Sequence, residues 1–153
     1  MTGMAVDVSI APRAPRGGGD QVRVTVGDRV VALQLVNAGL ACCAVEVAAA
    51  LQRLPRDDAA DGHGISAELH VLLVSGTVTD RLAPAVLAAY DALPEPRRVI
   101  SYGACSNSGG PYWDSYSVTK GVDQLLPVDL FVPGCPPRPE AMTDAVVQLV
   151  AKP

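Results

Sequence analysis

Hydrophobic and polar residues follow two different periods along the chain. Residues 22–26 alternate between valine and polar side chains, a pattern typical of a half-buried strand. A Gly27-Asp28 turn then leads into the apolar run 30–36, so the two segments predict a hairpin that feeds a buried strand. Three further compact apolar runs end at or near glycine and predict buried parallel strands: Leu69–Val74, Val99–Tyr102 and Leu130–Val132.

Helix-like segments lie between these runs. Pro84 and Pro139 each stand near the start of one, where proline is tolerated because the first amides of a helix have no partner within it. The predicted helices are residues 43–54, 84–93 and 140–150, with a fourth at 117–126. Strands that alternate with helices at this spacing predict an α/β fold, a doubly wound and mostly parallel sheet with helices on both faces, of the flavodoxin-like kind.

The predicted elements fit one domain. The chain has 153 residues, of which 49% are hydrophobic and 18% charged, enough to bury a core without disulfides or metal staples. We expect residues 21–153 to form this domain and residues 1–20, which include three consecutive glycines, to form a flexible N-terminal arm. Residues 31–51 are apolar over a length that could cross a membrane, but Gly39 and Glu46 inside the run argue against a span.

The net charge of the chain and its distribution argue against some classes of function. Twelve Lys and Arg against sixteen Asp and Glu give a net charge of −4, and no basic stripe is present. Proteins that bind nucleic acid carry clustered basic side chains, so we expect no nucleic-acid partner. The first residues lack the charged start and apolar run of a secretory signal, and we therefore expect the cysteines to be kept reduced.

Four cysteines follow three of the predicted strands. Cys42 and Cys43 come after the run 30–36, Cys105 follows Tyr102, and Cys135 follows Val132. The carboxyl ends of parallel strands share one edge of an α/β sheet, so residues distant in sequence can converge there on one site. The placement of the thiols therefore indicates a metal centre.

Several chemistries could use four thiols. Structural zinc normally takes paired C-x₂₋₄-C ligands, a spacing that this chain lacks. A disulfide framework does not suit a chain without a secretory signal, and a lone catalytic thiol would leave three cysteines unexplained. Four buried structural cysteines in an ordinary core are a further alternative. An iron–sulfur cluster accepts four thiolates from irregularly spaced loops, and the glycines near Cys105 and prolines around Cys135 favour it.

Five segments together carry a resemblance to a known family. They are residues 39–46, 75–79, 90–96, 101–110 and 127–140, and they include the tandem cysteines and both later cysteine loops. In this order they resemble the B subunit of NADH:quinone oxidoreductase, or respiratory complex I, a family related to the small subunit of nickel–iron hydrogenases. The resemblance covers about residues 30 to 150.

The resemblance implies a cofactor and a role. Cys42, Cys43, Cys105 and Cys135 would ligate one [4Fe–4S] cluster at the carboxyl ends of the strands, and the cluster would pass electrons to quinone. The chain would be an electron-transfer subunit of a proton-translocating NADH dehydrogenase-type complex, without complete catalytic activity of its own. The implied partners are a ferredoxin-like iron–sulfur subunit, a hydrogenase-large-like subunit and an integral membrane subunit, with quinone nearby. The implied location is peripheral, on the cytoplasmic side of the bacterial cell membrane.

Departures from the family pattern leave two alternatives. After Glu46 the family carries an Arg-Phe-Gly segment and a Ser-Pro-Arg-Gln-Ala-Asp segment, and residues 47–69 contain neither. One alternative is the electron relay of a membrane-bound nickel–iron hydrogenase, although those relatives commonly space their first two cysteines as C-x-x-C and here the two are adjacent. The other is a cluster-free scaffold paralogue that keeps the fold.

Charged and aromatic residues near the cysteines are candidates for supporting roles. Glu46 lies one helical turn past the tandem cysteines and could accept protons coupled to cluster reduction, or could cap the helix or face a partner. Arg138 could offset the charge of a cluster or pair with a surface acid. Tyr112, Asp114 and Tyr116 either contact a partner or form a solvated turn.

Overall fold

The described residues form one six-stranded sheet with helices packed against it. A computed structural model describes residues 6–9, 21–27, 29–38, 41–53 and 67–152. Six strands lie side by side in chain order, β1 to β6. The first three are antiparallel neighbours, and β3 to β6 run parallel. The strands are β1 (Val6–Ser9), β2 (Gln21–Val26), β3 (Arg29–Ala38), β4 (Leu69–Gly76), β5 (Arg97–Tyr102) and β6 (Leu130–Val132).

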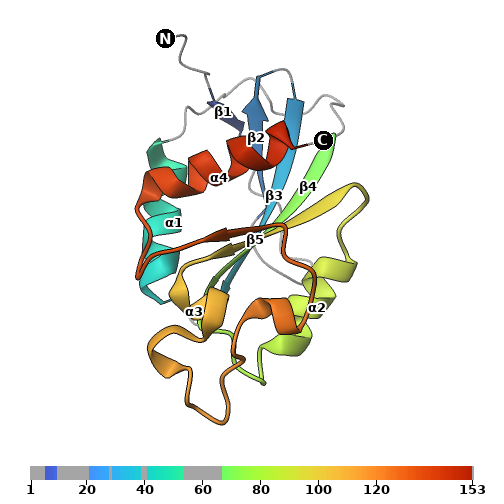
Figure 1. Cartoon of the computed structure of the whole chain (residues 1–153). Coiled ribbons are helices and arrows are strands. Elements are labelled where there is room, and N and C mark those ends of the chain that lie inside the picture. Colours follow the sequence, from blue (N-terminus) through green and yellow to red (C-terminus); the bar gives the residue numbers. More distant parts are fainter. Residues whose placement is uncertain (1–5, 10–20, 28, 39–40, 54–66, 153) are drawn as a thin grey trace.

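The predicted α/β class is confirmed. The hairpin expected at residues 22–36 is the β2–β3 pair, in which Val26 lies opposite Arg29. The helices α1 (Cys42–Arg53), α2 (Ala83–Asp91) and α4 (Pro139–Ala151) occupy the places of three predicted helices. Figure 1 shows α1 and α4 on one side of the sheet and α2 on the other, so the sheet is covered on both faces.

Alternate residues of β4 supply two separate cores. Val71 and Leu73 pack into the core beneath α1 and α4, while Leu72 and Val74 pack into the core beneath α2. All four side chains are fully buried. A strand buried on both faces needs apolar residues at successive positions, which is why β4 reads as a continuous apolar run.

The prediction of a helix at residues 117–126 is wrong. The structure has there only a short 3₁₀ turn, η3 (Val122–Gln124), preceded by Gly121 with φ of +117°. A Cβ atom at Gly121 would lie 2.7 Å from the backbone oxygen of Asn107 in the short helix α3 (Ala104–Ser108), so a close approach to that helix sets the path of this segment. A contact with a distant part of the chain thus overrides the local helical pattern.

Two other expectations, the N-terminal arm and the apolar run 31–51, concern segments that are only partly described. Within the arm expected at residues 1–20, residues 6–9 form β1 and pair with β2, and the other residues of that arm lie outside the described part. In the apolar run 31–51 the described residues form most of β3 and most of α1. Among the helices described, none has both the length and the apolar character needed to cross a membrane.

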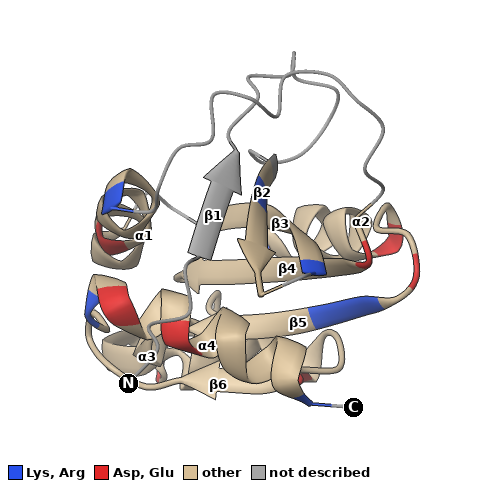
Figure 2. Ribbon diagram, turned by 90° about the horizontal axis from the view of Figure 1, so that it is seen from above, with Lys and Arg blue, Asp and Glu red and all other residues tan. Residues whose placement is uncertain are grey.

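The adjacent basic residues Arg97 and Arg98 stand at the beginning of β5, where Figure 2 shows the blue segment of that strand. Arg97 lies over the ring of Tyr90, 4.2 Å from its centre, and donates a hydrogen bond to the Tyr90 carbonyl at 3.0 Å. Arg98 forms an ion pair of 3.1 Å with Asp129. The two arginines therefore hold the amino end of β5 to Tyr90 and Asp129, at the end of the strand that is remote from Cys105.

Leu73 provides a test of the core. Leu73→Ala is expected to lower the free energy of unfolding by about 2–5 kcal/mol because the fully buried side chain leaves a cavity. Leu87 on α2 is 36% exposed, and Leu87→Ala is expected to cost no more than about 1 kcal/mol. Urea denaturation of the full-length chain measures both values. Equal losses for the two variants would contradict the position of Leu73 in the core.

Candidate metal centre

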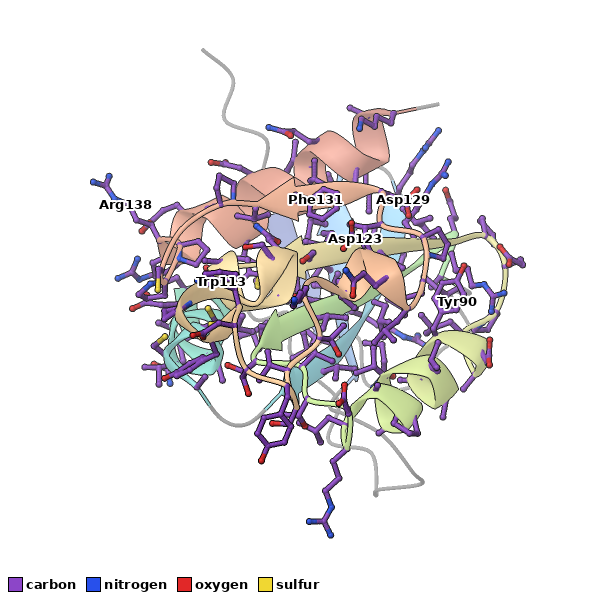
Figure 3. All side chains as sticks on the ribbon, turned by 60° about the horizontal axis from the view of Figure 1, so that its bottom comes forward. Tyr90, Trp113, Asp123, Asp129, Phe131 and Arg138 are labelled. Carbon is purple, nitrogen blue, oxygen red and sulfur yellow. The ribbon has the colours of Figure 1, made fainter. Side chains whose placement is uncertain are left out.

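The cysteines lie where the parallel strands end. Cys42 and Cys43 are the first residues of α1, which follows β3. Cys105 lies in a short helix directly after β5, α3 (Ala104–Ser108), and Cys135 comes three residues after β6. All four thiols are free; Cys43 and Cys105 are buried, whereas Cys42 and Cys135 are exposed. Figure 3 shows sulfur atoms on the side of the molecule where Trp113 and Arg138 are labelled.

Glycines delimit the helix that carries Cys105. Gly103 precedes α3 with φ of +94° and ψ of 161°, a conformation that is essentially restricted to glycine. Gly109 ends the helix in the left-handed region, and its amide donates to the Cys105 carbonyl at 2.9 Å. A helix of five residues is too short for hydrophobic periodicity to reveal, and the paired glycines are the sequence signal that could have found it.

Two of the glycines also make room for thiols. A Cβ atom at Gly103 would lie 2.5 Å from the sulfur of Cys43, and one at Gly110 would lie 2.9 Å from the sulfur of Cys105. Both distances are too short for any side chain. The Cys43 sulfur therefore lies directly against the backbone that leads to Cys105, although α1 and α3 are far apart in sequence.

Cys43 shares an electrostatic environment with two other thiols. Burial, followed by the neighbouring Cys42 and Cys105, raises its pKa to about 11, while a hydrogen bond from the Gly76 backbone acts in the opposite direction. The thiol is thus protonated at neutral pH when no metal is bound. Because a metal binds the thiolate, binding at Cys43 must release a proton.

Backbone hydrogen bonds bring the segment around Cys135 to the same place. The Gly103 amide donates to the Val132 carbonyl at 2.9 Å, and the Ala104 amide donates to the Gly134 carbonyl at 2.8 Å. These bonds continue the pairing of β5 with β6 beyond the ends of both strands. The second of them joins the residue before Cys105 to the residue before Cys135.

The donor set at this edge of the sheet consists of four cysteine thiols. Within the described ranges, no three His, Cys, Asp or Glu side chains are grouped as the ligands of one metal ion would be. A four-iron cluster takes one thiolate at each iron, so its ligands surround a volume and do not converge on a point. Four thiols distributed around one edge of the sheet, two of them buried, suit such a cluster.

The supporting residues lie near the same edge. Burial raises the pKa of Tyr102 to about 12, with Cys43, Glu46 and Glu140 adding to the effect, so Glu46 acts electrostatically on the side chain next to the thiols. Glu46 is half-buried. Among the described residues Arg138 forms no ion pair, and Figure 3 shows its side chain pointing away from the ribbon. Its charge is therefore available beside the Cys135 segment.

The loop after Cys105 presents aromatic side chains to solvent. It begins with a 3₁₀ turn, η2 (Gly110–Tyr112), and Trp113 follows with 62% of its surface exposed. Tyr112 and Tyr116 are also exposed, as is Asp114. The described chain thus leaves this loop uncovered on the side of the molecule that carries the cysteines.

Gly103→Ala tests the contact with Cys43. The backbone conformation alone costs an alanine about 1–3 kcal/mol, and the overlap with the Cys43 sulfur is expected to add about 1–3 kcal/mol. Gly27→Ala gives a reference for a positive φ without a steric overlap, because Gly27 has φ of +66° and its Cβ would meet nothing within 4 Å, so it is expected to lose less than Gly103→Ala. Urea denaturation of both variants gives the difference. Equal destabilisation would contradict the close packing of Cys43 on Gly103.

Known proteins resemble the chain over most of its length. It is 51% identical over 139 residues to the NADH-quinone oxidoreductase B subunit 1 of Salinispora tropica, covering 88% of this chain and 73% of that protein. It is 54% identical over 130 residues to the NADH-quinone oxidoreductase B subunit 2 of Streptomyces griseus subsp. griseus, covering 81% of this chain but only 54% of that protein.

A solved structure shares the fold. A chain of the membrane-bound sulfane sulfur reductase, an archaeal respiratory membrane complex, aligns with a TM-score of 0.56 and 30% identity. The alignment covers 75% of this chain and 67% of that chain. Residues 30–149 match the family described as NADH ubiquinone oxidoreductase, 20 Kd subunit, and the chain therefore belongs to this family.

Proposed function

We propose that Cys42, Cys43, Cys105 and Cys135 bind one [4Fe–4S] cluster and that the chain relays electrons through it. The observation that carries the proposal is the convergence of three cysteine segments on one sheet edge. The Cys43 sulfur packs against Gly103, and backbone hydrogen bonds hold the Cys135 segment beside the start of α3. Such a cluster, when bound, accepts and donates single electrons.

Two of the four proposed ligands lie where solvent access is limited. Cys43 and Cys105 are buried, and the Gly76 amide points a hydrogen bond at the Cys43 sulfur, which favours its thiolate form. Four prolines between Pro133 and Pro139 remove amide donors from the Cys135 segment. Burial, hydrogen bonds to sulfur and water exclusion are the means by which a protein sets the potential of a cluster.

The relatives indicate the larger assembly. Both bacterial relatives are named as B subunits of NADH-quinone oxidoreductase, and the solved relative belongs to a respiratory membrane complex. We therefore propose that this chain passes electrons to quinone in a membrane-associated NADH:quinone oxidoreductase of the proton-translocating type. Its proposed neighbours are a ferredoxin-like iron–sulfur subunit, a hydrogenase-large-like subunit and an integral membrane subunit, with the chain peripheral on the cytoplasmic side.

Serine substitution at each cysteine tests the cluster. The parental chain, purified without oxygen or reconstituted with iron and sulfide, is expected to hold about four irons. Each of Cys42→Ser, Cys43→Ser, Cys105→Ser and Cys135→Ser is expected to lose the electron paramagnetic resonance (EPR) signal of the reduced cluster, because a hydroxyl is a much weaker ligand for iron.

Ser108→Ala is the control for this series, since Ser108 is exposed and its hydroxyl bonds only to the Ala104 carbonyl of its own helix. It is expected to keep the parental iron, sulfide and EPR signal. Retention of the full iron and sulfide content by any one of the cysteine variants would remove that cysteine from the proposed ligand set.

Trp113 tests the proposed assembly. It is the one tryptophan of the chain and is 62% exposed, so its fluorescence reports on the cysteine side of the molecule. Co-assembly with the neighbouring subunits, prepared as tryptophan-free variants, is expected to shift its emission to shorter wavelength and to reduce quenching by acrylamide. Unchanged emission and quenching in an assembled complex would show that this loop is not covered by a partner.

A further inference from the structure

Cys135 lies in a segment with few backbone hydrogen-bond donors of its own. The Cys135 loop, residues 133–137, follows a strand of three residues and precedes α4, and its thiol is exposed. Proline occupies positions 133, 136 and 137, so only Gly134 and Cys135 in the loop carry an amide proton. Its position must therefore depend on donors from elsewhere that bind its flanking carbonyls.

One such donor holds the residue before the loop. The Asn107 side-chain amide donates to the Val132 carbonyl at 3.0 Å. The amide is oriented from its other side, because the Ser101 hydroxyl donates to the Asn107 Oδ1 atom at 2.6 Å. Ser101 is fully buried, and its oxygen lies 2.9 Å from the hydroxyl oxygen of Ser106. A buried polar network therefore aims the Asn107 amide at Val132.

A second donor holds the end of the loop. The Tyr102 hydroxyl lies 3.2 Å from the carbonyl oxygen of Pro137 and 2.9 Å from that of Arg138, so its one proton is shared between the two, with the shorter contact to Arg138. Arg138 is the N-cap residue of α4, so the same contact fixes where that helix begins. Tyr102 is fully buried, which limits the movement of its hydroxyl.

We propose that Tyr102 and Asn107 are positioning residues that hold the two ends of the Cys135 loop and thereby fix the Cys135 thiol relative to Cys105. Both belong to the segment 102–107 that carries Cys105. A displacement of either cysteine therefore displaces the hydrogen-bond donors of the other. This inference rests on the proposed cluster, for which Cys135 is the exposed ligand on a loop.

The inference predicts a specific effect on the cluster. Loss of a hydrogen bond at either end of the loop loosens Cys135 more than the ligands on α1 and α3, because those two helices keep their own backbone hydrogen bonds. Iron is then released faster to a chelator, by about two- to tenfold for one hydrogen bond. The geometry at one iron also becomes less uniform, which broadens the EPR signal of the reduced cluster and shifts its midpoint potential.

The test uses the full-length chain with its cluster. Tyr102→Phe removes only the hydroxyl, and Asn107→Leu removes both amide hydrogen bonds at similar volume. The matched controls are Tyr116→Phe, at a tyrosine that is 97% exposed, and Ser108→Ala on the same short helix as Asn107. Iron release, the EPR spectrum, the midpoint potential and the melting temperature are measured for each variant and for the parental chain.

We expect Tyr102→Phe and Asn107→Leu to bind the full complement of iron, to release it faster and to show altered EPR spectra, while both controls match the parental chain. A lower melting temperature with parental iron release, spectrum and potential would mean a purely structural role and would overturn the inference. Tyr102→Phe decides the question by itself if Asn107→Leu does not fold. A parental chain that binds no cluster would overturn the proposed function, and this inference with it.

Discussion

The structure depends on the pairing of β5 with β6 beyond the ends of the two strands. Hydrogen bonds from the Gly103 and Ala104 amides to the Val132 and Gly134 carbonyls continue the parallel register into the loops. The residues that precede the two later cysteines are thereby placed side by side, although 29 residues lie between Cys105 and Cys135 in the sequence. α1 completes the arrangement, because it packs on the same edge and buries Cys43 against Gly103.

Close packing of small residues makes this edge possible. Most core side chains are valine, leucine or alanine, and within the described chain Tyr102 is the one aromatic residue that is fully buried. Its ring fills space among these aliphatic residues. Its hydroxyl forms hydrogen bonds with the carbonyls of Pro137 and Arg138, which have few amide donors nearby because the segment is rich in proline. Three of the exposed aromatic residues, Tyr112, Trp113 and Tyr116, lie instead on the loop that begins at η2, where the proposed neighbouring subunits would cover them, whereas the exposed Phe131 lies on β6.

The sequence predicts those features that depend on local pattern. β4, β5 and β6 appear where apolar runs end near glycine. For β4 and β5 the reason is burial on both faces, which requires apolar residues at successive positions, whereas β6 exposes Phe131. The proximity of the cysteine segments also follows from local reasoning, since parallel strands bring their carboxyl ends to one edge.

The missed features depend on contacts between distant segments. Gly121 passes so close to the Asn107 carbonyl that the helical pattern of residues 117–126 is not realised, and no local signal reports that contact. The sequence also gives no sign of the hydrogen bonding between Tyr102 and the end of the Cys135 loop, because a tyrosine within a buried strand fits the apolar pattern like any other core residue. Tertiary geometry was needed to show that this side chain carries a polar function at its tip.

X-ray absorption spectroscopy at the iron edge, on the full-length chain purified without oxygen, tests the central claim most directly. If the four cysteines share one cluster, every iron has sulfur as its nearest neighbour and a second shell of iron atoms lies beyond it. Nearest neighbours of nitrogen or oxygen, or the absence of an iron–iron shell, would contradict a cluster held by Cys42, Cys43, Cys105 and Cys135.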